Sequence, residues 1–125
     1  MNWAAIGALA MGLAVDFGAF GAHALRDSLD AYSLGIYEKA AFYHFIHALG
    51  LLVVPILASS GMLPARSASR VCWLLSIGIL IFSGSLYLLA ITGVRSLGAI
   101  TPIGGTAFMA AWALLGWSLL RHRAS

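Results

Sequence analysis

Four long apolar runs, separated by short polar stretches, form the main pattern of this chain. The runs cover residues 3–24, 40–57, 71–92 and 101–120. A helix that crosses a lipid bilayer contains about 20 apolar residues, so each run is close to the length of one crossing. The pattern therefore predicts an all-α integral membrane protein whose four helices form an up-and-down bundle, with residues 1–125 as a single transmembrane domain.

The stretch between the first two runs is the most polar part of the chain, and it extends from Arg26 to Lys39. Its apolar residues recur at steps typical of one helix face: Leu29, Tyr32, Ile36 and Tyr37. Asp27 and Asp30 suit the beginning of a helix, because an aspartate can accept hydrogen bonds from the free amides there. We therefore expect a short interfacial helix between the first two spans.

The composition removes several classes of function. Hydrophobic residues make up 62% of the chain and charged residues 9%, whereas soluble domains are usually about 45–50% apolar and about 25% charged. Four spans use about 80 residues, which leaves no room for a separate soluble catalytic domain. The basic residues are scattered, so we expect no nucleic-acid partner. The single cysteine and the lack of zinc-spaced Cys and His pairs give no reason to expect a metal or another cofactor.

Charge also bears on the orientation, because four spans place both ends of the chain on one side of the membrane. The basic residues on that side are Arg66, Arg70, Arg121 and Arg123, and those on the other side are Arg26, Lys39 and Arg95. Lys and Arg are enriched in loops that stay in the cytoplasm. The count therefore favours an orientation with the N- and C-termini in the cytoplasm.

Rows of small side chains predict where the helices meet. The row on the first run is Ala5, Ala8, Gly12, Asp16, Ala19 and His23, at steps of three and four residues. The fourth run carries Gly104, Ala107 and Ala111, and also Ala110 and Ala113. The third run carries Ser76, Ser83 and Tyr87. Helices in lipid associate mainly through close packing, which small residues permit. We expect these faces to be the packing seams of the bundle.

The ionisable side chains gather in one leaflet. Asp16 lies nine residues before Leu25, which is roughly 13 Å along a helix and so near the middle of the membrane. A charge at that depth costs about 2.5–3.5 kcal/mol unless it finds a partner or water. His23 is seven positions further on, on nearly the same face. Because the topology places His47 and Arg95 on the same side, the pattern predicts one polar cluster there.

Several functions are compatible with this cluster. Its side chains could hold the helices in register, or line a pocket for a lipid, a small molecule or a protein partner. Asp16 with His23 or His47 could move protons through a transporter or channel. His23 and His47 could instead hold a haem between two helices. The absence of a G-x-S-x-G motif argues against a hydrolase. We expect a non-enzymatic role, and a homo-oligomer is compatible with each alternative.

Four segments of the chain are similar to one family of small membrane proteins. They read GAFGAHAL at 18–25, HALGLL at 47–52, FSGSLYLLAITG at 82–93 and LGAITPIGG at 97–105. In their order, and in their spread over nearly the whole chain, they resemble the YgdD/YwdK-like family. That family consists of four-span proteins of the bacterial inner membrane with no known activity. The resemblance thus implies a fold and a location but no reaction.

The resemblance also selects residues. Family histidines match His23 and His47, whereas His44 stands where a polar amide is more usual. The shared segments further contain Ser83, Ser85, Arg95, Thr101 and Pro102. The candidate set for a polar or ligand-binding cluster is therefore Asp16, His23, His47, Ser83, Arg95 and Thr101, with no catalytic residue and no metal ligand among them.

Overall fold

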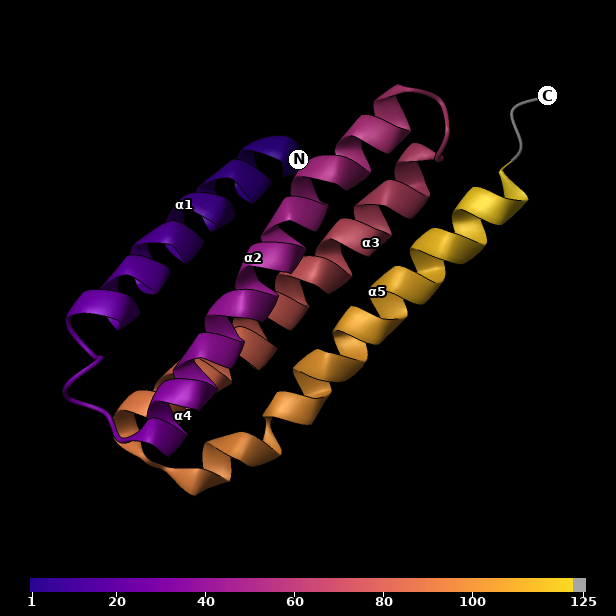
Figure 1. Cartoon of the computed structure of the whole chain (residues 1–125). Helices are drawn as coiled ribbons and strands as arrows, with labels where there is room; N and C mark the ends of the chain where they lie inside the picture. Colours follow the sequence, from indigo (N-terminus) through magenta and orange to yellow (C-terminus); the bar gives the residue numbers. More distant parts are fainter. Residues whose placement is uncertain (123–125) are drawn as a thin grey trace.

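The computed structural model describes residues 1–122, which form four long helices (Figure 1). In chain order the segments are α1 (Trp3–His23), α2 (Ala31–Ser59), α3 (Ala65–Gly78), the π-helical η1 (Ile79–Ser83), α4 (Gly84–Thr92), the 3₁₀-helical η2 (Arg95–Ala99) and α5 (Thr101–Arg121). Because α3, η1 and α4 follow one another without a break, they make one long helix. The all-α prediction with four candidate membrane spans is confirmed. Arg123, which entered the orientation count, lies outside the described residues.

The hairpin between α4 and α5 follows local sequence signals. Gly93 ends α4 with a φ of 72°, a left-handed conformation that glycine adopts without strain. Pro102 lies in the first turn of α5, where its missing amide hydrogen leaves no helical bond unmade. These two residues place the end of the third span and the start of the fourth where the pattern predicted them.

The connection between α1 and α2 corrects one expectation, because the chain forms no separate interfacial helix there. Residues 24–30 form turns, and α2 starts at Ala31 and continues into the second span. The Asp30 side chain caps α2 by accepting the backbone amide of Ser33 at 2.7 Å. Hydrogen bonds from Ser33 hold the pKa of Asp30 below its usual value, so the capping carboxylate is ionised at neutral pH. The second helix therefore begins nine residues earlier than the apolar run at residue 40.

The helices pack in a row rather than as a closed ring. Helix α1 packs along α2, and α2 packs against the long α3–η1–α4 helix. Helix α5 packs against α3 and η1, and in Figure 1 it lies on the opposite side of α2 from α1. Within residues 1–122, α1 has no comparable contact with any helix other than α2. As a result, most of the surface of α1 faces away from the protein.

The packing face of α1 differs from the seam that the small residues predicted. The predicted row, Ala5, Ala8, Gly12, Asp16, Ala19 and His23, is exposed along its whole length. The buried residues are instead Trp3, Gly7, Ala14 and Gly21. A Cβ at Gly7 would lie 2.9 Å from the backbone carbon of Leu51, so this face brings the two backbones close together. Small residues occupy both faces of α1, and only one of the two faces is used.

The seams predicted on the third and fourth spans are confirmed in part. Ser83, Tyr87, Gly104 and Ala111 are buried, and Ser76 and Ala107 are half-buried. Ala110 and Ala113 are exposed, so the second face predicted on α5 is wrong. Gly104 packs directly on the backbone of Phe82 in η1, where a Cβ would collide with the Phe82 nitrogen. The absence of a side chain at Gly104 thus lets α5 approach the π-helical segment.

Candidate functional site

His47 is buried between α2 and α5, and both of its ring nitrogens have partners. Its Nδ1–H donates to the backbone carbonyl of Tyr43 at 2.7 Å. Its Nε2 accepts the indole N–H of Trp112 at 3.0 Å, and the ring stacks on Phe108 with centroids 3.5 Å apart. Because an indole nitrogen can only donate, these bonds define a neutral imidazole. His47 therefore joins α5 to α2 and has no nitrogen left for a ligand in this arrangement.

A second buried network contains His44, to which the family resemblance gave little weight. The Nδ1 atom of His44 lies 2.9 Å from the hydroxyl of Tyr87 in α4. Tyr37 donates its hydroxyl to the backbone carbonyl of Phe17 in α1 at 2.6 Å. The rings of Tyr37 and Tyr87 meet edge to face, with centroids 5.0 Å apart. This network joins α1, α2 and α4 in the half of the molecule that contains the α1–α2 connection.

The candidate hydroxyl residues form contacts between segments. Ser83 donates to the backbone carbonyl of Ala40 in α2 at 2.8 Å. The hydroxyls of Ser85 in α4 and Thr101 in α5 lie 2.6 Å apart. Buried hydroxyls with partners stabilise contacts between helices in lipid. Ser83 and Thr101 thus hold the helices together.

Asp16, His23 and Arg95 do not meet His47 in a common pocket. Asp16 and His23 are exposed on the face of α1 that points away from α2. Arg95 is exposed in η2 and lines a separate depression of about 360 Å³ together with Asp30. The single polar cluster expected from the sequence is therefore not formed, because α1 turns its other face toward the protein and His47 faces α5.

This separation leaves two of the alternative functions without geometric support. His23 lies on the outer face of α1 while both nitrogens of His47 are engaged, so the two histidines do not face each other as haem ligands would. Asp16, His23 and His47 line none of the five principal cavities of residues 1–122.

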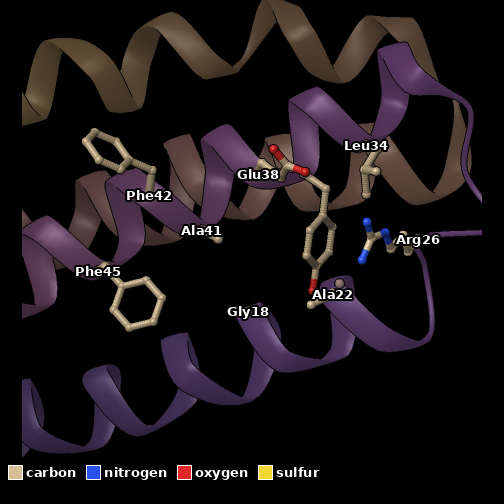
Figure 2. A pocket seen from close by; sticks show the side chains of 10 residues that line it. Gly18, Ala22, Arg26, Leu34, Glu38, Ala41, Phe42 and Phe45 are labelled. Carbon is tan, nitrogen blue, oxygen red and sulfur yellow. The ribbon is translucent and has the colours of Figure 1, made fainter.

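The largest of these cavities lies between α1 and α2, near the connection that joins them (Figure 2). It has a volume of about 560 Å³, and we refer to it as the α1–α2 pocket. Its lining consists of Gly18, Gly21, Ala22, Arg26, Leu34, Tyr37, Glu38, Ala41, Phe42 and Phe45. Binding pockets for small molecules usually enclose about 300–1,000 Å³. The pocket is thus large enough to hold part of an amphiphilic molecule.

The α1–α2 pocket is charged at one end and apolar at the other. Arg26 reaches it from the connection after α1, and Glu38 reaches it from the early part of α2. Phe42 and Phe45 lie further along α2, away from Arg26 (Figure 2). Opposite charges beside aromatic walls can receive a molecule that has a polar end and a hydrocarbon end.

The sequence builds this pocket from one face of α2 and from glycines of α1. On α2, the lining residues Leu34, Glu38 and Phe45 are spaced by four and seven positions, so they share one face. On α1, Gly18 and Gly21 contribute no side chain to fill the space. A Cβ at Gly21 would collide with the ring of Tyr37, which is already held by its hydroxyl bond to α1.

The fold and these contacts define a small helical membrane protein with four candidate spans. The family model described as "Protein of unknown function (DUF423)" matches residues 17–105, and the chain belongs to this family. It is 47% identical to a UPF0382 membrane protein of Staphylococcus saprophyticus over 110 residues, which cover 88% of this chain and 89% of the relative. It is 45% identical to the UPF0382 membrane protein YwdK of Bacillus subtilis over 112 residues, with the same coverage of 88% and 89%. These relatives confirm the resemblance found in the sequence, and no solved structure matches the chain.

Proposed function

We propose that this protein binds a membrane phospholipid in the α1–α2 pocket. One observation carries the proposal: a cavity of about 560 Å³ has Arg26 at one end, the rings of Phe42 and Phe45 at the other, and Glu38 between them (Figure 2). A phospholipid has the same division into a charged headgroup and hydrocarbon chains. A lipid is therefore the partner whose chemistry best fits the pocket, and the proposed role is non-enzymatic.

The depth of the lining residues supports a lipid in its normal orientation. Glu38 lies two residues before the apolar run that begins at residue 40, and Arg26 lies three residues after α1 ends at His23. Both charges thus belong at the level of the headgroups. Phe45 is seven residues beyond Glu38, about 10 Å deeper along the helix, where acyl chains lie.

We further propose that the protein spans the bacterial inner membrane with both termini in the cytoplasm. In the sequence, the four basic residues Arg66, Arg70, Arg121 and Arg123 belong to the side of the termini, against three on the other side, and this count favours the side of the termini as cytoplasmic. In this orientation the α1–α2 pocket opens in the leaflet that faces away from the cytoplasm. The similarity to relatives that are named as membrane proteins supports the placement in a membrane.

Gly18→Leu is expected to reduce the lipid retained by the purified protein about tenfold, because the leucine side chain would fill the pocket. A Cβ at Gly18 lies 3.5 Å from the ring of Phe45, an ordinary contact, so the first atom of the new side chain fits without a collision. The measurement is the molar ratio of phospholipid to protein after purification in a mild detergent.

Gly12→Leu provides a matched control for this experiment. Gly12 is also a glycine of α1, but it is exposed, and a Cβ there would have no neighbour within 4 Å. The Gly12→Leu protein is expected to retain as much lipid as the unmodified chain. Equal lipid retention by folded Gly18→Leu and Gly12→Leu proteins would contradict the proposed function.

A further inference from the structure

We infer that the α1–α2 pocket selects phospholipids whose headgroup carries both a phosphate and a primary amine. This inference rests on the proposed function, because it concerns the class of lipid bound at the same site. Its basis is the presence of one cationic and one anionic side chain, Arg26 and Glu38, in the lining of one cavity, with Glu38 between Arg26 and the phenylalanines (Figure 2). A headgroup with charges of both signs can satisfy both side chains.

Arg26 supplies the group that would bind the phosphate. A guanidinium has a planar set of N–H donors, and two of them can bond two oxygens of one phosphate at the same time. Arg26 is exposed and reaches the pocket from the connection between α1 and α2, which is at headgroup level. It can therefore meet a phosphate without leaving the interface.

Glu38 supplies the group that distinguishes one headgroup from another. A primary ammonium has three N–H donors that a carboxylate can accept, whereas a trimethylammonium group has none. A headgroup without an amine would leave Glu38 near a phosphate of the same sign, which weakens its binding. Glu38 thus favours an aminophospholipid over both a choline lipid and an anionic glycerol lipid.

The aromatic side chains of the pocket support the same choice. Proteins commonly bind quaternary ammonium groups within several aromatic faces. Here Phe42 and Phe45 lie at the end away from Arg26 (Figure 2), and the aromatic ring that the lining places near Ala22 is that of Tyr37, which packs on Gly21. One ring does not form an aromatic cage, so this end is better suited to hydrogen bonds from an ammonium group than to a cation held among several aromatic rings.

The test uses the full-length chain in vesicles that contain equal amounts of phosphatidylethanolamine, phosphatidylcholine and phosphatidylglycerol with the same acyl chains. After extraction in a mild detergent, the retained lipids are identified by mass spectrometry. We expect the unmodified protein to retain phosphatidylethanolamine with about fivefold to tenfold enrichment over either other lipid. The hydrogen bond between the ammonium group and Glu38 accounts for an affinity difference of about this size. Retention in the proportions of the vesicle would overturn the inference.

Glu38→Gln tests the assigned residue directly. This change keeps the size of the side chain and removes its charge, so the preference for phosphatidylethanolamine over phosphatidylglycerol should fall close to one. Total lipid per protein should stay within about twofold, because the apolar part of the pocket is unchanged. Asp27→Asn is the control. Asp27 is an exposed acid in the connection between α1 and α2, and it does not line the pocket, so removing its charge should leave the preference intact.

The outcomes separate the inference from the proposed function. An unchanged preference in the Glu38→Gln protein would overturn the inference while leaving lipid binding in place. Equal lipid retention by the Gly18→Leu and unmodified proteins would overturn lipid binding in the pocket, whatever the headgroup preference. Melting curves of all variants, measured in the same detergent, show whether each protein is folded.

Discussion

Gly104→Ala is expected to destabilise the protein by about 3 kcal/mol, the upper end of the usual cost of overpacking. Gly104 lies in α5 against the backbone of Phe82, and the new Cβ would collide with the nitrogen of that residue. A side chain could rotate away, but the backbone of η1 cannot move without disturbing its neighbours. One of those neighbours is Ser83, whose hydroxyl bonds the Ala40 carbonyl in α2. The expected result is a displaced α5.

The measurement for this prediction is the apparent melting temperature in one detergent, compared with that of Gly116→Ala. Gly116 lies in the same helix, is exposed, and would give its Cβ no neighbour within 4 Å. Alanine is a better helix former than glycine by up to about 1 kcal/mol, so Gly116→Ala should be neutral or stabilising. Equal melting temperatures for the two variants would show that α5 does not approach η1 as closely as described.

Asp16→Leu is expected to favour membrane insertion of the first span by about 3–4 kcal/mol without lowering the stability of the folded protein. An aspartate near the centre of a span costs about 2.5–3.5 kcal/mol on insertion scales, and a leucine contributes about 0.3–0.6 kcal/mol in the favourable direction. Asp16 is exposed on the outer face of α1, away from the contact with α2. Its replacement should therefore remove no contact within the chain.

Two measurements check this prediction together. The inserted fraction of the first span is measured in microsomes by glycosylation of engineered acceptor sites, and the melting temperature is measured on purified protein. Asp27→Leu, which changes an acid in the connection beyond α1, should alter insertion much less. A marked loss of stability in the Asp16→Leu protein would mean that Asp16 has a partner inside the folded chain.

The sequence predicts those parts of the fold that depend on local signals. The length of each apolar run predicts four candidate spans, and the structure has four helices of that kind. Gly93 and Pro102 mark the end of one helix and the start of the next, because each acts on its own backbone. The sequence did not predict that residues 31–40 continue into the second span as one helix, and this also has a local explanation. The Asp30 cap starts a helix, and no residue that follows it ends that helix before the second span.

The choice between two faces of a helix could not be made from local signals. Helix α1 has small residues on both faces, so the row through Gly12 and Ala19 was as good a candidate as the one through Gly7 and Ala14. The shape of α2 decides which face of α1 packs inward, because the backbone at Leu51 approaches Gly7. Because α1 turns that face inward, Asp16 points outward and the predicted polar cluster is lost.

The polar contacts of the interior also could not be predicted from local signals. The sequence places His47 in the predicted polar cluster, but its partner Trp112 is 65 positions away and on another helix. Arg26 and Glu38 belong to the polar stretch for which the sequence predicts a short interfacial helix. Opposite charges that border two adjacent apolar runs could have indicated a shared site. Their convergence on one cavity depends on the packing of α1 against α2, which only the structure supplies.

The most direct test of lipid binding in the α1–α2 pocket is photocrosslinking with a phospholipid that carries a diazirine on its acyl chain. If a phospholipid occupies the pocket, mass spectrometry of the crosslinked protein will find the label mainly on the pocket residues Ala41 and Phe45. Leu9 and Val15, on the exposed surface of α1, should carry only the low level expected from bulk lipid. Labelling of Leu9 and Val15 at the level of Ala41 and Phe45 would contradict the account.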